Sequence, residues 1–264
     1  MSNLKAIIDR RRRLKKSFLE RQKIFGTWTS FSEPQIAELF ALTNCGFVGI
    51  DIEHGVTDLR TCQQIIAASQ AGGSLCLPRI ASHNPEMIKR LLDAGADGII
   101  APMVNTREQA EAISSWCKFA PMGQRSYGVN RAQTYGLDFE EYAQSWNETS
   151  VLIAQIESIE AVKNIDEILS VHGIDGVMVG PYDMSGSLGI PGQIDHPQIR
   201  EATSEVLRKA RECKKSCGTQ IVPLASQLAA SKFEEGYTFV VLSSDIFLMA
   251  EWVKDARQLI QKFQ

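Results

Sequence analysis

Short apolar runs recur along the chain, and segments with a helical pattern, such as Pro85–Ala94 and Ile199–Cys213, separate most of them. Continuous apolar runs of this length are typical of strands in a parallel sheet that is covered on both faces. The eight runs are Phe25–Phe31, Phe47–Ile52, Ser74–Ile80, Gly98–Val104, Val151–Ile156, Gly176–Val179, Gln220–Leu224 and Phe239–Leu242.

Eight strand–helix units predict a closed (β/α)8 barrel, and 264 residues suit one such domain. We expect an N-terminal helix over residues 1–24, the barrel over 25–245 and a C-terminal helix over 246–264. An open doubly wound sheet is the alternative. Its usual GxGxxG fingerprint after the first strand is absent.

Charge and hydropathy favour a cytoplasmic protein that binds neither nucleic acid nor membrane. The net charge is −3, no apolar run reaches membrane-spanning length, and the N-terminus lacks the apolar core of a secretory signal. The basic run Arg10–Arg13, Lys15, Lys16 permits a contact with an anionic surface or nucleic acid. Because Asp9 and Glu20 dilute this charge, we favour a solvated helix packed beside the barrel.

The six cysteines are expected to be plain thiols in a reducing compartment, because no CxxC pair occurs. Cys213 and Cys217 are expected one helical turn apart, which would make half a metal site. No second Cys or His pair accompanies them.

Polar side chains at the ends of the second and third strands predict one part of an active site, since barrel enzymes react at the carboxyl ends of their strands. Asp51 and Glu53 share a face of the second strand, and His54 begins the following loop. A carboxylate beside an imidazole suits a general base, whereas a capping Asp and a surface His are the alternative. Arg79 ends the third strand; it either clamps a substrate carboxylate or pairs with Asp51 or Glu53.

The fifth and sixth strands predict a metal site. Gln155 and Glu157 share a face of the fifth strand, and Asp183 follows the sixth. Neighbouring strands lie about 4.8 Å apart, so Glu157 and Asp183 would converge. Two carboxylates, completed by water and a chelating substrate, suit Mg²⁺ or Mn²⁺. The alternative for Asp183 is a helix N-cap.

Two further features are interpreted as structural. The glycine-rich segment 185–192 is expected to form an ordered loop that lines the site and not a phosphate-binding loop. His83, His172 and His196 lie in loop-like contexts and are expected to be structural.

Together, GIDIEHG (49–55), PRI (78–80), LLDAGADGIIAPMV (91–104), AQIES (154–158) and VGPYDMSGSLGIPGQ (179–193) resemble the metal-dependent pyruvate aldolases of the HpcH/HpaI family. The resemblance extends from about Phe25 to about Ala256. It implies that His54 is the catalytic base, supported by Asp93, and that Arg79 stabilises an enolate. It implies a divalent metal, Mg²⁺ or Mn²⁺ with Co²⁺ or Zn²⁺ as alternatives, on Glu157 and Asp183, and substrate contacts from Gln155 and Tyr182.

The resemblance also implies a homohexamer, a trimer of dimers, in which Phe247–Phe263 packs on a partner subunit. Asp93 ends a helix that returns toward the opposite face of the barrel, so it would reach a catalytic pocket more easily on a neighbouring subunit. Tyr182 replaces a smaller residue that is frequent in the family, and the N-terminal extension is longer than in many relatives.

The predicted reaction is reversible cleavage of a 4-hydroxy-2-oxo acid to pyruvate and an aldehyde, through a metal-stabilised enolate in which Asp51 tunes His54. No apolar run contains the lysine that a Schiff-base aldolase needs, so a metal must stabilise the enolate. A related lyase or a citrate-synthase-like condensing enzyme that uses oxaloacetate is the nearest alternative. A non-catalytic binding barrel is the alternative from another class.

Overall fold

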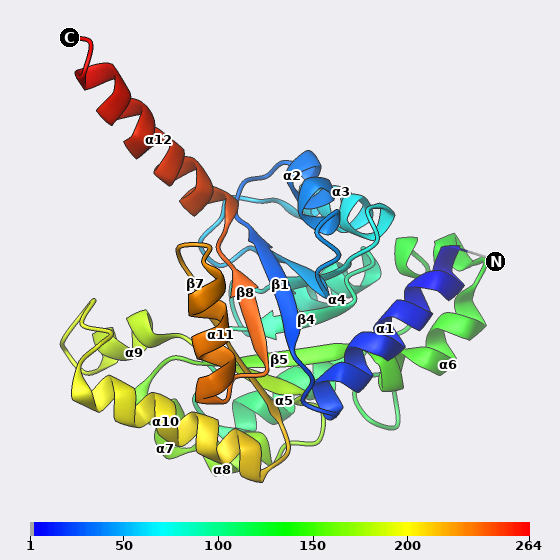
Figure 1. Ribbon diagram of the computed structural model, residues 1–264. Helices are drawn as coiled ribbons and strands as arrows, with labels where there is room; N and C mark the ends of the chain where they lie inside the picture. Colours follow the sequence, from blue (N-terminus) through cyan, green and yellow to red (C-terminus); the bar gives the residue numbers. More distant parts are fainter. Residues whose placement is uncertain (1–2) are drawn as a thin grey trace.

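The computed structural model describes residues 3–264 and contains a closed barrel of eight strands (Figure 1). Every strand is parallel to both neighbours, and β8 closes the barrel against β1. The predicted barrel is therefore confirmed, and the open sheet is wrong. The strands are β1 (Ile24–Thr29), β2 (Phe47–Asp51), β3 (Leu75–Arg79), β4 (Gly98–Ala101), β5 (Val151–Ile156), β6 (Gly176–Val179), β7 (Ser216–Ile221) and β8 (Phe239–Leu242).

Helices connect and cover these strands, and several begin at side chains that cap their free backbone N–H groups. Asp58, Asn84 and Thr106 accept such bonds at the starts of α3, α4 and α5. The helices are α1 (Asn3–Leu19), α2 (Pro34–Ala41), α3 (Leu59–Ala71), α4 (Pro85–Asp93), α5 (Arg107–Cys117), the 3₁₀ helix η1 (Arg131–Gly136), α6 (Phe139–Thr149), α7 (Ile159–Lys163), α8 (Ile165–Leu169), α9 (Pro181–Ser187), α10 (Pro197–Glu212), α11 (Ser226–Glu235) and α12 (Asp245–Gln261).

The seventh strand lies earlier than its sequence pattern predicted. The expected run was Gln220–Leu224, but β7 spans Ser216–Ile221. Its first residues are small or polar and still buried, so the strand does not read as an apolar run. The ring of Phe239 fills the space where a side chain at Gly218 would lie, 2.1 Å from an ideal Cβ. The side chain that fills the barrel interior beside Gly218 therefore comes from β8.

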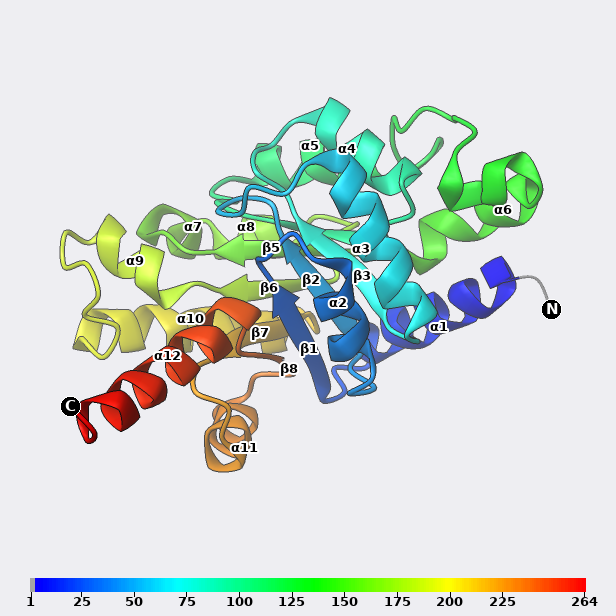
Figure 2. The ribbon, with the colours of Figure 1, turned by 90° about the horizontal axis from the view of Figure 1, so that it is seen from above.

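Helix α1 closes the floor of the barrel, the end at which the strands begin (Figures 1 and 2). Its Leu14 and Phe18 belong to the same buried cluster as Phe47 and Phe239 inside the barrel. The Phe18 and Phe239 rings lie 5.3 Å apart. Complete burial of such side chains contributes about 1.5–3 kcal/mol each, so α1 is part of the core.

The basic run of α1 is only partly the solvated surface that we expected: Arg12, Arg13 and Lys16 are exposed, whereas Arg11 and Lys15 are covered. Arg11 is 2% exposed and lies 3.4 Å from the buried Asp97, which precedes β4. Lys15 pairs with Asp175, which precedes β6, at 2.5 Å. Buried charges require partners, and these two aspartates supply them. The sequence reading failed because each aspartate lies far along the chain from its basic partner.

The cysteines are free thiols, and all except Cys213 are buried. Cys213 follows the end of α10, whereas Cys217 lies inside β7, so the prediction that they lie one helical turn apart is wrong. Burial raises the pKa of Cys217 to about 12, which makes it a poor nucleophile and metal ligand.

Helix α12 projects away from the barrel, and the C-terminus lies at its far end (Figure 1). Asp245 is its only buried residue. The helix leaves large apolar side chains exposed: Ile246, Phe247, Leu248, Met249, Trp252, Val253, Leu259 and Ile260. None of the helices within residues 3–264 combines the length and apolar character needed to cross a bilayer.

Candidate active site

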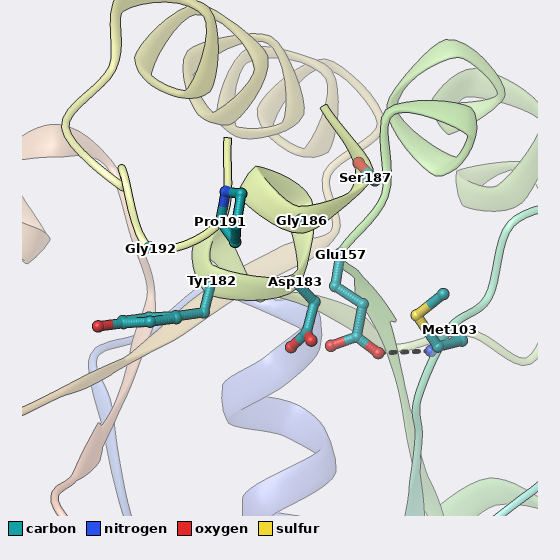
Figure 3. Close-up of a pocket in the computed structure, with 8 residues that line it drawn as sticks. All are labelled: Met103, Glu157, Tyr182, Asp183, Gly186, Ser187, Pro191 and Gly192. Atoms are coloured by element: carbon teal, nitrogen blue, oxygen red, sulfur yellow. Dashed lines mark hydrogen bonds between the residues drawn. The ribbon is translucent and has the colours of Figure 1, made fainter. Parts of the chain in front are cut away.

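Glu157 and Asp183 line one pocket at the end of the barrel where the strands finish (Figure 3). Glu157 follows β5, and Asp183 lies in the first turn of α9 after β6. The pocket has a volume of about 710 Å³. The structure therefore brings together the two carboxylates from which we predicted a metal site.

Glu157 is a buried carboxylate with limited hydrogen bonding. It is 3% exposed, accepts a 2.6 Å bond from the Met103 backbone N–H and a 3.1 Å bond from Gln155 Nε2. Burial, followed by the negative charges of Glu53 and Asp183, raises the pKa of Glu157 to about 7, against the lowering effect of the Met103 N–H. A nearby positive charge would stabilise the ionised form of Glu157.

Gly180 has no side chain, and this leaves room for the Glu157 carboxylate. An ideal Cβ at Gly180 would lie 2.8 Å from Glu157 Oε2, so a larger residue would displace it. Gly180 is also the residue before α9, which excludes the N-cap alternative for Asp183. Asp183 is exposed, and its side chain makes no hydrogen bond or ion pair to another residue within 3–264. Its carboxylate faces the same space as that of Glu157 (Figure 3).

Arg79 lies between two carboxylates. It lies opposite Asp51 in the parallel register of β2 and β3, with Nε 3.2 Å from Asp51 Oδ1 and Nη2 2.8 Å from Oδ2. Its Nε is also 3.2 Å from Glu53 Oε2, although the angle there does not make a hydrogen bond. The guanidinium carbon lies 4.9 Å from the Trp28 ring centroid. The structure thus contains the pairing of Arg79 with Asp51 and Glu53 that the sequence left open as the alternative to a substrate clamp.

His54 stands at the edge of this cluster and is 66% exposed. Its Nε2 lies 3.7 Å from Glu53 Oε2. Within residues 3–264, Glu53 is the carboxylate that forms an ion pair with the His54 imidazole ring. Asp51 instead accepts a 3.1 Å bond from the His54 backbone N–H. Asp51 therefore orients the loop that carries His54, whereas Glu53 can orient the ring.

Asp93 lies apart from the other predicted site residues within one chain. It ends α4 and accepts a 2.8 Å bond from the buried Arg125. It lines a different pocket, together with Arg90 and Asn130. Its expected contact with a histidine on a neighbouring subunit stays a prediction.

Tyr182 and the glycine-rich segment complete the pocket mouth. Tyr182 is 66% exposed, and its ring lies 3.9 Å from an ideal Cβ at Gly192. Gly186, Ser187 and Pro191 line the same pocket. The segment therefore lines the site, as its sequence predicted. Gln155 is 3% exposed, and its Oε1 makes no hydrogen bond.

Met103 is a site residue that sequence reasoning missed. It has a left-handed backbone, with φ +49°, and its N–H points to Glu157 (Figure 3). Backbone strain of this kind is concentrated at functional sites. No sequence signal marks the position, because methionine in an apolar run is ordinarily a core residue.

The remaining histidines differ in their contacts. His196 caps α10, where its Nδ1 accepts a bond from the Gln198 N–H. His83 Nε2 lies 2.6 Å from the Pro102 carbonyl oxygen, which links the loops after β3 and β4. His172 is exposed in a turn. His196 thus has a structural role as a helix cap, and the structural roles expected of His83 and His172 stay predictions.

The donor set fits a hard divalent cation. The two carboxylates supply oxygen ligands, and the buried oxygens Gln155 Oε1 and Glu53 Oε2 are left without hydrogen bonds. No group of three His, Cys, Asp or Glu side chains within residues 3–264 forms a complete metal cage. Mg²⁺ is commonly held by one or two carboxylates, with water and substrate oxygens filling the other positions.

The sequence of residues 24–251 matches the model of the HpcH/HpaI aldolase/citrate lyase family. The chain belongs to this family. A hydroxypyruvate/pyruvate aldolase of Roseobacter denitrificans is 32% identical over 237 residues, which cover 89% of this chain and 91% of that protein. The relatives of this chain thus include an aldolase.

Solved structures of the family share the fold. A family protein from Burkholderia cenocepacia has a TM-score of 0.87 and 28% identity, covering 94% of this chain and 99% of that one. The citrate synthase SbnG has a TM-score of 0.81 and 27% identity, covering 94% of this chain and 97% of that one. The structural relatives of this chain therefore include a citrate synthase.

Proposed function

We propose that this protein is a metal-dependent aldolase that reversibly cleaves a 4-hydroxy-2-oxo acid to pyruvate and an aldehyde. The observation that carries the proposal is the meeting of Glu157 and Asp183 in one pocket. The raised pKa of Glu157 supports it, because a dication would compensate the buried negative charge. The aldolase activity of the Roseobacter relative supports the same reaction class.

Glu157 and Asp183 would hold the metal, Mg²⁺ or Mn²⁺ (alternatively Co²⁺ or Zn²⁺), while Gln155 and Tyr182 would contact the 2-oxo acid. When bound, the metal supplies positive charge to the carboxylate and keto oxygens of the substrate and to the enolate oxygen that develops. Met103 positions Glu157 through its backbone N–H. Gly180 leaves the space into which the Glu157 carboxylate extends.

His54 acts as the base in the cleavage direction. It removes the proton of the 4-hydroxyl group, directly or through water, and the C3–C4 bond breaks as the aldehyde carbonyl forms. The electron pair of that bond enters the pyruvate enolate, and protonation at C3 gives pyruvate. Arg79 places positive charge near the enolate, where preorganised charge lowers the barrier most effectively.

The first experiment mixes pyruvate with simple aldehydes in the presence of Mg²⁺ or Mn²⁺ and repeats the assay in EDTA. We expect aldol product only with metal. Exchange of the pyruvate methyl protons with D₂O, followed by NMR, separates catalysis from mere binding because enolisation alone produces exchange. Full activity in chelator would remove the metal from the proposal, and absence of exchange with metal present would favour a binding barrel.

The similarity to citrate synthase SbnG supports a second candidate, in which the enolate attacks a different electrophile. Oxaloacetate would then be the acceptor. Product analysis by mass spectrometry, with oxaloacetate in place of the aldehyde, distinguishes the two functions. Both candidates use the same carboxylates.

The exposed apolar side chains of α12 support a homo-oligomer, a hexamer built as a trimer of dimers. Contiguous exposed apolar surface of this kind marks an interface. In such an assembly α12 packs on a partner subunit, and Asp93 approaches the His54 of a neighbour. Sedimentation velocity measures this oligomeric state directly.

A further inference from the structure

A second pocket lies at the floor of the barrel, at the opposite end from Glu157 and Asp183. It has a volume of about 370 Å³, is open to solvent, and is bordered by one face of α1, the start of β1, the loop before β2 and the start of β3. The face of α1 that lines it carries Arg10, Arg13 and Ser17, which lie three to seven residues apart and so share one side of the helix.

The charge of this pocket is of one sign. Arg10, Arg13 and Lys23 line it, and none of the described residues in its wall is acidic. This is unusual in a chain whose net charge is −3. Asn44 and Ser17 add neutral polar groups to the wall.

The basic side chains of this pocket lack the acidic partners that other basic side chains of α1 have. Arg11 and Lys15 pair with Asp97 and Asp175, and Arg12 pairs with Asp9. The side chain of Arg13 makes no ion pair or hydrogen bond with any residue of the described chain, 3–264.

Lys23 and Arg10 also lack an acidic partner among the ion pairs within residues 3–264. Lys23 lies 5.1 Å above the Phe233 ring, and Arg10 donates to the carbonyl oxygens of Ala6 and Gln70. Neither contact neutralises the charge.

We propose that this floor pocket, defined by Arg10, Arg13 and Lys23, binds a small polyanion that carries two or more negative charges. Guanidinium groups match phosphate and carboxylate oxygens through paired N–H donors, so both kinds of polyanion share the required chemistry. The volume lies within the range of small-molecule sites. Since the pocket lies at the opposite end of the barrel from the carboxylate pair, its ligand is not the substrate of the proposed reaction.

A ligand in this position would connect α1 to the barrel. Arg10 and Arg13 belong to α1, whereas Lys23 immediately precedes β1. A polyanion that binds both elements favours the folded floor and raises the melting temperature, because it binds only the native arrangement. The expected role is therefore regulation of stability at the closed end of the barrel.

The test titrates pyrophosphate and, separately, tricarballylate into the protein by calorimetry, after metal has been removed with EDTA and the EDTA, itself a polyanion, has been removed by dialysis into metal-free buffer. We expect saturable binding of at least one of them, with a rise in melting temperature. The Arg13→Glu/Lys23→Glu double variant should weaken binding by about tenfold or more. Pyrophosphate-only binding would assign a phosphate ligand, and tricarballylate-only binding a polycarboxylate.

The matched control is the Arg12→Glu/Lys16→Glu double variant, which makes the same charge change on α1 outside the pocket wall. It should bind as the unmodified protein does. Equal weakening in both double variants would show a general charge effect and overturn the proposal, as would absence of saturation with either anion at low salt. The Glu157→Gln variant should retain binding, so this result is independent of the proposed catalytic function.

Discussion

The guanidinium of Arg79 contacts both carboxylate oxygens of Asp51 across neighbouring strands, at 3.2 and 2.8 Å. Asp51 also accepts the backbone N–H of His54. One buried carboxylate thus orients both the arginine expected to stabilise the enolate and the loop of the expected base. A change in the geometry of the Arg79–Asp51 pair should therefore lower turnover more than it lowers the stability of the fold.

Arg79→Lys tests that geometry. Lysine keeps the charge but cannot maintain paired contacts with Asp51, so we expect kcat to fall about 100-fold to 1000-fold, as when a preorganised donor is removed. Steady-state assays of pyruvate and aldehyde measure the change. Arg107→Lys is the control, because Arg107 pairs with Glu111 at the surface and should leave kcat unaltered. A normal kcat in Arg79→Lys would assign Arg79 a purely structural role.

We expect each of the variants Glu157→Gln and Asp183→Asn to weaken metal binding by at least about 100-fold. Mutation of a residue that only hydrogen-bonds to a metal ligand typically costs about 10-fold to 100-fold in affinity, and loss of the ligand itself should cost more. Calorimetry with Mn²⁺ measures the affinity, and activity should recover in part at high metal for Asp183→Asn. Glu160→Gln alters an exposed carboxyl three residues away and should bind metal normally. Unchanged Mn²⁺ affinity in Glu157→Gln would contradict the assignment.

Stability of the metal-free protein should depend on pH through Glu157. Its pKa is raised from 4.5 to about 7 in the folded chain, so the folded state holds the proton more tightly than the unfolded state does. This carboxyl therefore favours folding fully below pH 4.5, and the contribution disappears as pH rises through 7. The change is up to about 3 kcal/mol. Urea unfolding in EDTA from pH 5 to 8 measures it.

Glu157→Gln should flatten this part of the profile, and Mg²⁺ should restore stability to the unmodified protein above pH 7. Glu160→Gln should keep the slope. An unchanged slope in Glu157→Gln would assign the pH dependence to another group.

Sequence pattern predicted most of the fold because buried parallel strands read as apolar runs, as Val151–Ile156 does. Ser216–Ile221 was misplaced because its interior volume is filled by Phe239 from another strand. The burial of Arg11 was also hidden, since its partner Asp97 is more than eighty residues away along the chain. Pairings across such separations leave no local periodicity.

The site was predictable where its residues end strands. Glu157 and Asp183 meet as expected because the parallel register places the ends of β5 and β6 side by side. The partner of the Glu157 carboxylate was not predictable, because Met103 contributes only a backbone N–H with a left-handed φ. The nearest carboxylate to the His54 ring was likewise decided by side-chain rotamers and not by the alternation of the strand.

Arg11→Ala should destabilise the protein by about 3–5 kcal/mol, because it leaves Asp97 buried without its ion-pair partner. It also removes a guanidinium that lies 5.2 Å from the Tyr142 and Trp146 ring centroids. Urea unfolding measures the loss. Arg12→Ala, the neighbouring residue with an exposed Asp9 partner, should change stability by less than about 1 kcal/mol. Equal effects in the two variants would show that α1 does not close the barrel in solution.

Helix α12 offers the sharpest test of assembly. Trp252 and Leu259 lie seven residues apart on one exposed apolar face, 64% and 58% exposed, whereas Glu251 and Lys254 pair on a polar side. If the apolar face packs on a partner subunit, Trp252→Glu/Leu259→Glu introduces two unpaired charges into that interface and should shift the protein to smaller species. Light scattering after gel filtration measures the mass.

Lys254→Glu alters charge on the polar side of the same helix and should preserve the assembly. The dissociated Trp252→Glu/Leu259→Glu variant should keep a folded barrel, since Asp245 is the only residue of α12 that the chain itself buries. It should nevertheless lose turnover if Asp93 acts on the His54 of a neighbour, because that contact exists only between subunits. Full activity in the dissociated form would confine the catalytic machinery to one chain and leave Asp93 with its structural pairing to Arg125.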